Sequence, residues 1–329
     1  SKEINWDEIE KATGQSESRI RDLATLFSKS RSTIICWAMG ITQHRNSVDT
    51  IREIVNVLLL GGHIGRQGAG VCPVRGHSNV QGDRTVGITH APSKKFLSAL
   101  EERYGVNPVE KHGADSVHAV ESMRERGGVF LSLGGNFLSA MSDTDRTAEA
   151  LESCSLTVQI STKLNRSHLI TGETAIILPC LGRTDEQTTS NGPQILSVEN
   201  SMGVVHMSNG TNKRPSMSMR SEPTIIAGIA QKRQDLAGGA IQWSDLGSDF
   251  SLIREGIEAT VPGFEAYNSR ILHPSGFELP NPPRDTRTFR TSSGRAEFSA
   301  AEISSFVPDD DAYTMMTIRS HDQFNTTIY

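Results

Sequence analysis

Long hydrophobic runs are absent from this chain of 329 residues. The longest mostly apolar stretches, such as 54–60 and 175–180, are far shorter than the roughly 20 residues that span a bilayer, so no membrane span is expected. Aromatic residues make up only 5%, which argues against a surface for stacked bases. The 33 basic residues are outnumbered by 38 acidic ones, and a net charge of −5 disfavours a general nucleic-acid binder.

Cysteines are few and scattered, at positions 36, 72, 154 and 180. Without a CxxC pair or paired histidines, the sequence predicts no zinc site and no iron–sulfur cluster held within this stretch. The spacing does not suggest a disulfide scaffold either, and it favours a reducing, cytoplasmic setting with four free, mostly buried thiols. The sequence also lacks a GxSxG motif, an HExxH motif and a catalytic constellation of paired carboxylates, so a standard hydrolase mechanism has little support.

The composition is that of a soluble globular protein, with 36% hydrophobic and 22% charged residues and a mean hydropathy of −0.35. The length predicts about two domains. The first residues, SKEINWDEIE, carry no initiator Met and no secretory signal, and the last, TMMTIRSHDQFNTTIY, predict a strand and a polar loop without a closing element. We therefore expect this sequence to be a piece of a longer protein.

The first 62 residues have the pattern of half a doubly wound α/β unit. Helical spacing of apolar residues predicts one amphipathic helix over 6–28. A strand is expected over 33–37, running into Gly40, and a helix begins at Ser47 and ends at the pair Gly61 and Gly62.

A second α/β unit follows, with helices expected over 116–126 and 144–153 and strands over 129–133, 156–160 and 174–179. Gly134, Gly135 and Asn136 follow the first of these strands. A strand, a glycine loop and a helix bring backbone N–H groups to a phosphate at the carboxyl end of a parallel sheet. Two such units predict two nucleotide-like sites or one shared site.

After Gly182 the chain changes to short polar segments. A helix is expected around 225–232, and the Pro-rich stretch 278–285 is a linker candidate. The segments 292–298 and 315–320 suggest a hairpin or the start of a β-rich domain.

Residues 61–82 form the densest candidate segment, with seven glycines in 22 residues. The polar side chains within it include those of His63, Arg66, Arg75, His77, Asn79 and Gln81. Glycine lets the backbone approach a ligand closely, so this composition suits a large phosphate-bearing cofactor. An ordinary glycine-rich surface loop is the alternative. The segment 159–168 is equally open to two interpretations, a nucleotide-contacting loop or a helix start capped by Ser161 or Thr162.

These segments together resemble a known family. The runs WAMGITQHRNSVDTIREIVNVLLLGGHIGRQGAGVCPVRGHSNVQG, LGGNF, QISTKLNRSH, AIILPCLGRTD, TSNGPQ and SGRAEF are similar to the molybdopterin oxidoreductases of the dimethyl sulfoxide reductase type. The resemblance is closest to formate dehydrogenase alpha subunits and formate-dehydrogenase-like proteins. It covers nearly the whole chain in order, and PVRGxxNVQG is its most specific part.

The resemblance implies an α/β fold of two doubly wound Rossmann-like lobes, domains II and III of that family, joined by irregular α+β segments. Residues 1–77 would belong to the first lobe and 78–190 to the second. Residues 191–310 would be connecting segments partly from the iron–sulfur region, and 311–329 would begin a C-terminal molybdopterin dinucleotide-binding domain. The implied cofactor is molybdenum held by two molybdopterin guanine dinucleotides.

The resemblance also implies residues that hold this cofactor. The implied set is Gly40, Ile41, Thr42 and Gln43 for one dinucleotide; Gly134, Gly135, Asn136, Gln159, Ser161, Thr162 and Lys163 for the other; Gly70 and Asn79 in the glycine-rich segment; and Arg319, Ser320, His321 and Gln323 at the start of the C-terminal domain.

Arg75 and His77 are the implied catalytic residues. Arg75 matches the arginine that formate dehydrogenases place beside the metal, where a guanidinium orients an anionic carboxylate while a hydride, or a proton and electrons, leave. A phosphate-binding or structural arginine is the alternative. His77 stands where the formate dehydrogenase pattern has Gln, so pterin contact is expected and the substrate stays open.

Family members also carry a [4Fe–4S] cluster motif and a Cys or selenocysteine metal ligand upstream of a segment like that around Trp6. The implied function is oxidation of formate, or a similar oxyanion, to carbon dioxide, with electrons passed to that cluster and on to a redox partner protein. We expect this stretch to be inactive by itself. The alternatives are a nitrate- or arsenate-type reductase, and a non-catalytic relative that uses the scaffold as a binding module.

Overall fold

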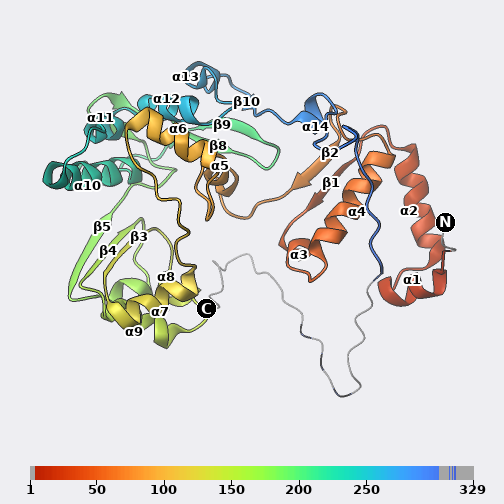
Figure 1. Cartoon of the computed structure of the whole chain (residues 1–329), viewed down its shortest axis with the longest axis horizontal. Helices are drawn as coiled ribbons and strands as arrows, with labels where there is room; N and C mark the ends of the chain where they lie inside the picture. Colours follow the sequence, from red (N-terminus) through yellow and green to blue (C-terminus); the bar gives the residue numbers. More distant parts are fainter. Residues whose placement is uncertain (1–3, 304–310, 312, 314, 316–329) are drawn as a thin grey trace. The chain divides into compact units, whose positions relative to one another are not determined.

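A computed structural model describes residues 4–303, 311, 313 and 315 of the chain. It is mixed α/β with parallel sheets, and the described residues divide into two compact units (Figure 1). Unit 1 contains 4–81, 199–204 and 278–303, and unit 2 contains 82–198 and 205–277. The division expected at 77, 190 and 310 stays a prediction.

The helices are α1 (Trp6–Thr13), α2 (Glu17–Lys29), α3 (Met39–Thr42), α4 (Ser47–Leu60), α5 (Val80–Thr85), α6 (Lys94–Tyr104), α7 (Ser116–Arg126), α8 (Phe137–Ala140), α9 (Thr144–Glu152), the 3-10 helix η1 (Arg166–Leu169), α10 (Glu222–Ala237), α11 (Trp243–Ser248), α12 (Phe250–Thr260), α13 (Tyr267–Arg270) and α14 (Pro282–Asp285). The strands are β1 (Ile34–Trp37), β2 (Gly70–Pro73), β3 (Val129–Leu133), β4 (Leu156–Ser161), β5 (Thr174–Pro179), β6 (Thr188–Thr189), β7 (Gly192–Pro193), β8 (Leu196–Glu199), β9 (Val204–Ser208) and β10 (Phe277–Glu278). They form parallel sheets β1-β2 and β3-β4-β5, an antiparallel pair β6-β7 and a sheet of order β10-β9-β8.

Unit 1 contains the expected strand and helix at 34–37 and 47–60. Strands β1 and β2 run parallel, and α4 lies between them in the chain, with Leu58 fully buried. The single helix expected over 6–28 is wrong, because the chain breaks at Gly14. This glycine adopts φ 67° and its N–H caps the Glu10 carbonyl at 2.8 Å, after which α2 begins at Glu17. A residue in the left-handed region ends a helix, and glycine takes that conformation without steric cost.

The centre of unit 2 is the parallel sheet β3-β4-β5, in which Leu131 pairs with Val158 and Val158 with Ile176. The three predicted strands and the helices predicted at 116–126 and 144–153 are confirmed within one residue. The middle strand β4 is buried along four consecutive residues, as a parallel strand covered on both faces should be. The described strands follow one another in chain order, without the reversal of order that marks a doubly wound sheet.

Helix α10 covers part of one face of this sheet. Its Ile225 and Ile226 pack against Val158, Ile160 and Cys180. On the edge strand β3, the side chains of Val129, Leu131 and Leu133 stay exposed by 66%, 45% and 49%. The core on this sheet is therefore centred on the middle strand β4, and both neighbouring strands, β3 and β5, contribute little burial.

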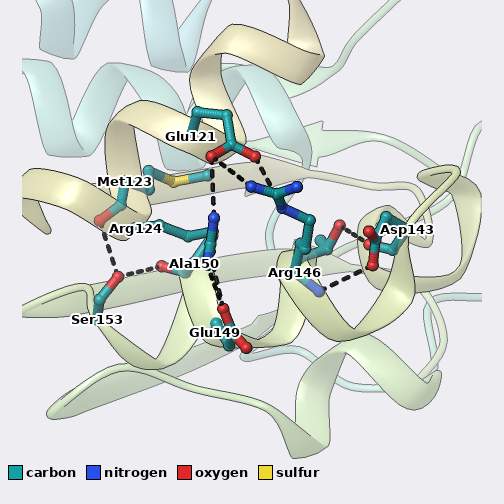
Figure 2. Close-up of polar contacts among 9 residues, drawn as sticks. Glu121, Met123, Arg124, Asp143, Arg146, Glu149, Ala150 and Ser153 are labelled. Atoms are coloured by element: carbon teal, nitrogen blue, oxygen red, sulfur yellow. Dashed lines mark hydrogen bonds and ion pairs between the residues drawn. The ribbon is translucent and has the colours of Figure 1, made fainter.

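Helices α7 and α9 pack against each other through a network of charges (Figure 2). Glu121 accepts from Arg124 at 2.9 Å and pairs with Arg146 at 3.1 Å, and Arg124 also pairs with Glu149 at 2.7 Å. The ion pair with Glu149 contributes most to raising the pKa of the Arg124 guanidinium. Because Arg146 and Glu149 are exposed and Glu121 and Arg124 only half-buried, these ion pairs fix the register of the two helices more than they stabilise the fold.

The later part of the chain differs in detail from expectation. The helix expected around 225–232 is confirmed and is longer, spanning α10. The linker candidate 278–285 contains the end of β10 and the short helix α14, which Asn281 caps. The segment 292–298, expected to be part of a hairpin or the start of a β-rich domain, contains a turn at Gly294 (φ 68°) and no strand. Of its expected partner 315–320, only Met315 is described.

None of the helices within the described residues is long and apolar enough to cross a membrane. The cysteines are free thiols, of which Cys154 and Cys180 are buried, Cys72 is half-buried and Cys36 is exposed. The expectation of mostly buried thiols is therefore wrong for unit 1, because Cys36 shares with Ile34 the open face of β1.

Candidate functional site

The carboxyl ends of β1 and β2 form one edge in unit 1. The Val74 N–H donates to the Trp37 carbonyl at 2.7 Å, so the chain leaves both strands side by side. From β1 it enters α3, which contains Gly40, Ile41 and Thr42 and is followed by Gln43; from β2 it enters the segment that carries Arg75. In parallel α/β sheets this edge is where ligands bind. Gly40 faces open space, since a Cβ placed there would meet nothing within 4 Å.

Arg75 and His77 are exposed in the segment between β2 and α5. The Arg75 Nε donates to Gln81 Oε1 at 3.2 Å, a bond that spans this segment and orients the guanidinium. Asn79 adopts φ 63°, and its Oδ1 accepts the Glu199 N–H at 2.9 Å. The side-chain amide of Asn79 therefore links the segment after β2 to the backbone of Glu199 at the end of β8.

The remaining donors of the segment 61–82 lie elsewhere. His63 is 1% exposed and packs edge-on against Phe27, with ring centroids 5.0 Å apart, and Arg66 donates to the Arg31 carbonyl. Gly70 is buried at the amino end of β2, paired with Ile34, which places it at the opposite end of the strand from Arg75. The structure thus groups Arg75 and His77 with the end of β2 and separates them from His63 and Gly70.

Unit 2 presents a second such edge, at the ends of β3, β4 and β5. Gly134 and Gly135 have φ of 69° and 81°, and a Cβ on either would meet nothing within 4 Å. The Gly134 N–H donates to the Ile160 carbonyl at 2.7 Å, which holds the glycine turn beside β4. Ser161 ends β4, and its hydroxyl donates to the Lys163 carbonyl at 2.7 Å.

Thr162 lies close to the end of β5, because a Cβ on Gly182 would lie 3.7 Å from Thr162 Cγ2. Gly134, Gly135, Ser161, Thr162 and Lys163 therefore share one edge of the sheet, and this edge has small residues and an exposed lysine. Such a surface can hold a phosphate or a polar ring through backbone N–H groups and hydroxyls.

Two other predicted residues are engaged within the protein. Gln159 is 4% exposed, and its Nε2 donates to the Ser167 carbonyl at 2.9 Å. The Ser167 hydroxyl donates to Asn136 Oδ1 at 3.2 Å and accepts the Leu138 N–H at 3.0 Å. These bonds fix the loop that follows β4 against the glycine turn.

The anchor of this loop is Asn165, which the sequence analysis did not identify. Its Oδ1 accepts the Ser167 N–H at 2.9 Å, and its Nδ2 donates to the Gly135 carbonyl at 2.8 Å. The helix start capped by Ser161 or Thr162 is wrong, because the turn begins at Asn165 and His168 completes a capping box with it. Asn165 followed three residues later by a hydrogen-bonding side chain is the signal that could have predicted this cap.

A half-buried carboxylate, Glu222, lies near the end of β5 and was also not predicted. Burial raises the pKa of Glu222, and the Arg183 charge opposes that shift. Burial, with a smaller contribution from the Glu222 charge, raises the pKa of the Cys180 thiol to about 11. The surroundings of Glu222 and Cys180 at the end of β5 therefore favour the neutral forms of both groups, and Cys180 stays a thiol at neutral pH.

We expect Glu222→Gln to stabilise unit 2 at neutral pH. Because the folded-state pKa of Glu222 is raised, the unfolded chain loses this proton first, and the contribution of Glu222 to stability falls as pH rises through that window. The free energy of unfolding by urea, compared with wild type, should be higher for the variant at pH 8 and equal at pH 4. Glu265→Gln is the control with opposite sign, since backbone hydrogen bonds lower the pKa of Glu265. An equal change at both pH values would contradict the prediction.

Unit 2 also contains a cavity of about 350 Å³ lined by residues that include Arg84, Lys95, Phe96 and Val261. None of the predicted site residues lines it. Within the described residues, no group of three or more His, Cys, Asp or Glu side chains could hold a metal ion. Arg319, Ser320, His321 and Gln323 lie outside the described residues.

Comparison with known proteins gives relatives that extend well beyond this chain. No family model matches it. It is 48% identical over 328 residues to an uncharacterized oxidoreductase of Mycobacterium bovis, covering 99% of this chain and 42% of that protein. It is 43% identical over 328 residues to the protein YdeP of Escherichia coli, covering 98% and 43%. A putative formate dehydrogenase of Staphylococcus aureus is 37% identical over 124 residues, 35% of this chain and 13% of that protein. The chain thus spans about two fifths of the relatives that it matches almost throughout.

Proposed function

We propose that this chain is part of an oxidoreductase whose complete form uses a molybdenum bis(molybdopterin guanine dinucleotide) cofactor to oxidise formate to carbon dioxide. The observation that carries the proposal is the pair of open, glycine-flanked strand edges, one in each unit, at which most of the implied cofactor residues gather. The relatives' names support the broader class: one is called an oxidoreductase and another, over a shorter stretch, a putative formate dehydrogenase.

The residues present fit a dinucleotide chemically. In unit 2, the positive φ angles and open space at Gly134 and Gly135 suit a backbone that approaches a phosphate, and the exposed Lys163 supplies a cation. In unit 1, Gly40, Thr42 and Gln43 would offer backbone and side-chain donors at the end of β1. Gln159 and Asn136 would act by holding the binding loop, because their side chains already bond within the protein. The two units would then correspond to the two Rossmann-like lobes that the family resemblance implies.

Arg75 would supply the substrate contact. The guanidinium is exposed after the end of β2, and Gln81 orients it through Nε. Its two Nη groups can donate two parallel hydrogen bonds to a carboxylate. Bound molybdenum would supply the two-electron acceptor, and the electrons would pass to a [4Fe–4S] cluster and a partner protein. A nitrate- or arsenate-type oxyanion is the second candidate substrate, because His77 stands where the formate dehydrogenase pattern has Gln and so leaves the substrate open.

Elemental analysis of the full-length protein, expressed with molybdate, tests the cofactor. We expect about one molybdenum per chain and release of about two guanine nucleotides on denaturation, because each α/β unit would hold one dinucleotide. Steady-state assays with formate, and with nitrate or arsenate as acceptor, then separate the two substrate candidates. A folded full-length protein that contains no molybdenum would overturn the proposal.

A further inference from the structure

Two cysteines lie opposite each other in the parallel pair of unit 1. In the register of β1 and β2, Cys36 is the direct partner of Cys72. Residues in register on parallel strands place their side chains on the same face. The two thiols are hydrogen-bonded to each other, and Cys36 is exposed while Cys72 is half-buried. This pair is therefore both preorganised and accessible.

The backbone around the pair is fixed on both sides. The Gly70 N–H donates to the Thr33 carbonyl at 2.9 Å, and the Val74 N–H to the Trp37 carbonyl at 2.7 Å. Neighbouring strands lie about 4.8 Å apart, which falls within the roughly 4.4–6.8 Å between Cα atoms that a disulfide accepts. A bond between the two sulfurs therefore requires side-chain rotation and only small backbone movement.

We propose that Cys36 and Cys72 are a redox-active dithiol that peroxide converts into a disulfide across β1 and β2. Cys36 reacts first, since its thiol is the exposed one: its thiolate attacks one peroxide oxygen, the O–O bond breaks, and a sulfenic acid forms. The Cys72 sulfur then attacks the Cys36 sulfur and expels water. In total two thiols and one hydrogen peroxide give one disulfide and two waters, so the sulfurs are oxidised and the peroxide oxygens reduced.

The other two cysteines lack this chemistry. Cys154 and Cys180 are each 1% exposed, whereas Cys36 is exposed and Cys72 half-buried. Burial raises the pKa of the Cys72 thiol as it does those of Cys154 and Cys180, so access to peroxide, and not pKa, separates the two pairs. Oxidation should therefore be confined to Cys36 and Cys72.

The two cysteines lie close to the strand edge that carries the candidate site of unit 1. Cys36 lies four residues before Gly40 and Cys72 three residues before Arg75, so a disulfide would join the two strands next to the edge described above. The proposal of a redox-active dithiol is based on the register of β1 and β2 and on the contact between the two thiols. It does not depend on the proposed formate chemistry.

Thiol trapping of the reduced 329-residue chain tests the proposal. After brief treatment with hydrogen peroxide, and then with N-ethylmaleimide in denaturant so that the buried thiols also react, wild type should carry two alkylated thiols of its four and be two hydrogen atoms lighter than expected for the free pair. Tryptic digestion should yield peptides 32–45 and 67–75 joined by a bond that dithiothreitol cleaves. Cys72→Ser should give instead a Cys36 sulfenic acid that dimedone captures, and Cys154→Ser, the matched control, should form the joined peptides as wild type does.

The result should be independent of protein concentration. Disulfide-linked dimers through Cys36, sulfinic acid at Cys36 without joined peptides, or equal oxidation of Cys154 would each overturn the proposal. The peptide map of wild type requires no substitution, so a variant that fails to fold leaves the test intact.

Discussion

Arg75→Ala in the full-length protein is expected to lower kcat/KM for formate about 100- to 1000-fold, the loss typical of removing a charged group that binds a reacting oxyanion. This prediction depends on the proposed function. The Arg75 guanidinium is exposed at the end of β2, and Gln81 Oε1 holds its Nε at 3.2 Å, so its two Nη groups can face a small carboxylate. Steady-state kinetics at saturating electron acceptor measure the effect.

Two further variants separate substrate binding from a structural role of Arg75. Arg75→Lys keeps the charge and loses the planar fork, so we expect an intermediate loss of about 10- to 100-fold. Arg66→Ala removes an arginine from the same glycine-rich segment whose side chain bonds the Arg31 carbonyl, and kcat/KM should stay within about twofold of wild type. Equal losses for Arg75→Ala and Arg66→Ala would show that both arginines only support the loop.

The elements that the sequence predicted well are those with strong local signals. Strands β3, β4 and β5 are short and mostly apolar, glycine flanks β3 and proline ends β5, and α4 ends where Gly61 follows its last apolar residue. The break between α1 and α2 was missed because a single glycine is tolerated inside a helix. Only its left-handed conformation at Gly14, which the sequence does not reveal, ends the first helix.

The candidate site was predictable at the level of strand ends and not at the level of side chains. Topology places Gly134 and Ser161 on one edge, and it follows from two predicted parallel strands. The engagement of Gln159 with Ser167 depends on how the loop after β4 folds back, which no periodicity encodes. The raised pKa of Glu222 likewise depends on burial at the start of α10. Long-range packing, and not local propensity, decides both.

The opposition of Cys36 and Cys72 illustrates the same limit. Each cysteine lies in an apolar stretch, which predicts burial. Their contact requires the observed register of β1 against β2. That register depends on how α4 and the glycine-rich segment, which lie between the two strands in the chain, fold back. A shift of one residue would place the two thiols on opposite faces.

Gly172→Ala is expected to lower the free energy of unfolding of unit 2 by about 2–4 kcal/mol, because it inserts an atom where none fits. A Cβ on Gly172 would lie 2.2 Å from the carbonyl oxygen of Cys154. That carbonyl accepts the Glu173 N–H at 3.0 Å, so it cannot move away without breaking the first bond between the entry to β5 and its neighbour. The obstacle is backbone, which a side-chain rotation cannot relieve.

Gly228→Ala provides the matched control for this glycine. Gly228 is exposed within α10, and a Cβ there would meet nothing within 4 Å. The same substitution should therefore raise the free energy of unfolding by about 0.5–1 kcal/mol through helix propensity. Urea denaturation followed by circular dichroism measures both changes. If Gly172→Ala were as stable as wild type, Gly172 could not lie as close to the Cys154 carbonyl as the structure has it. The pairing of β4 with β5, which places Pro179 beside Ser161, would then also be wrong.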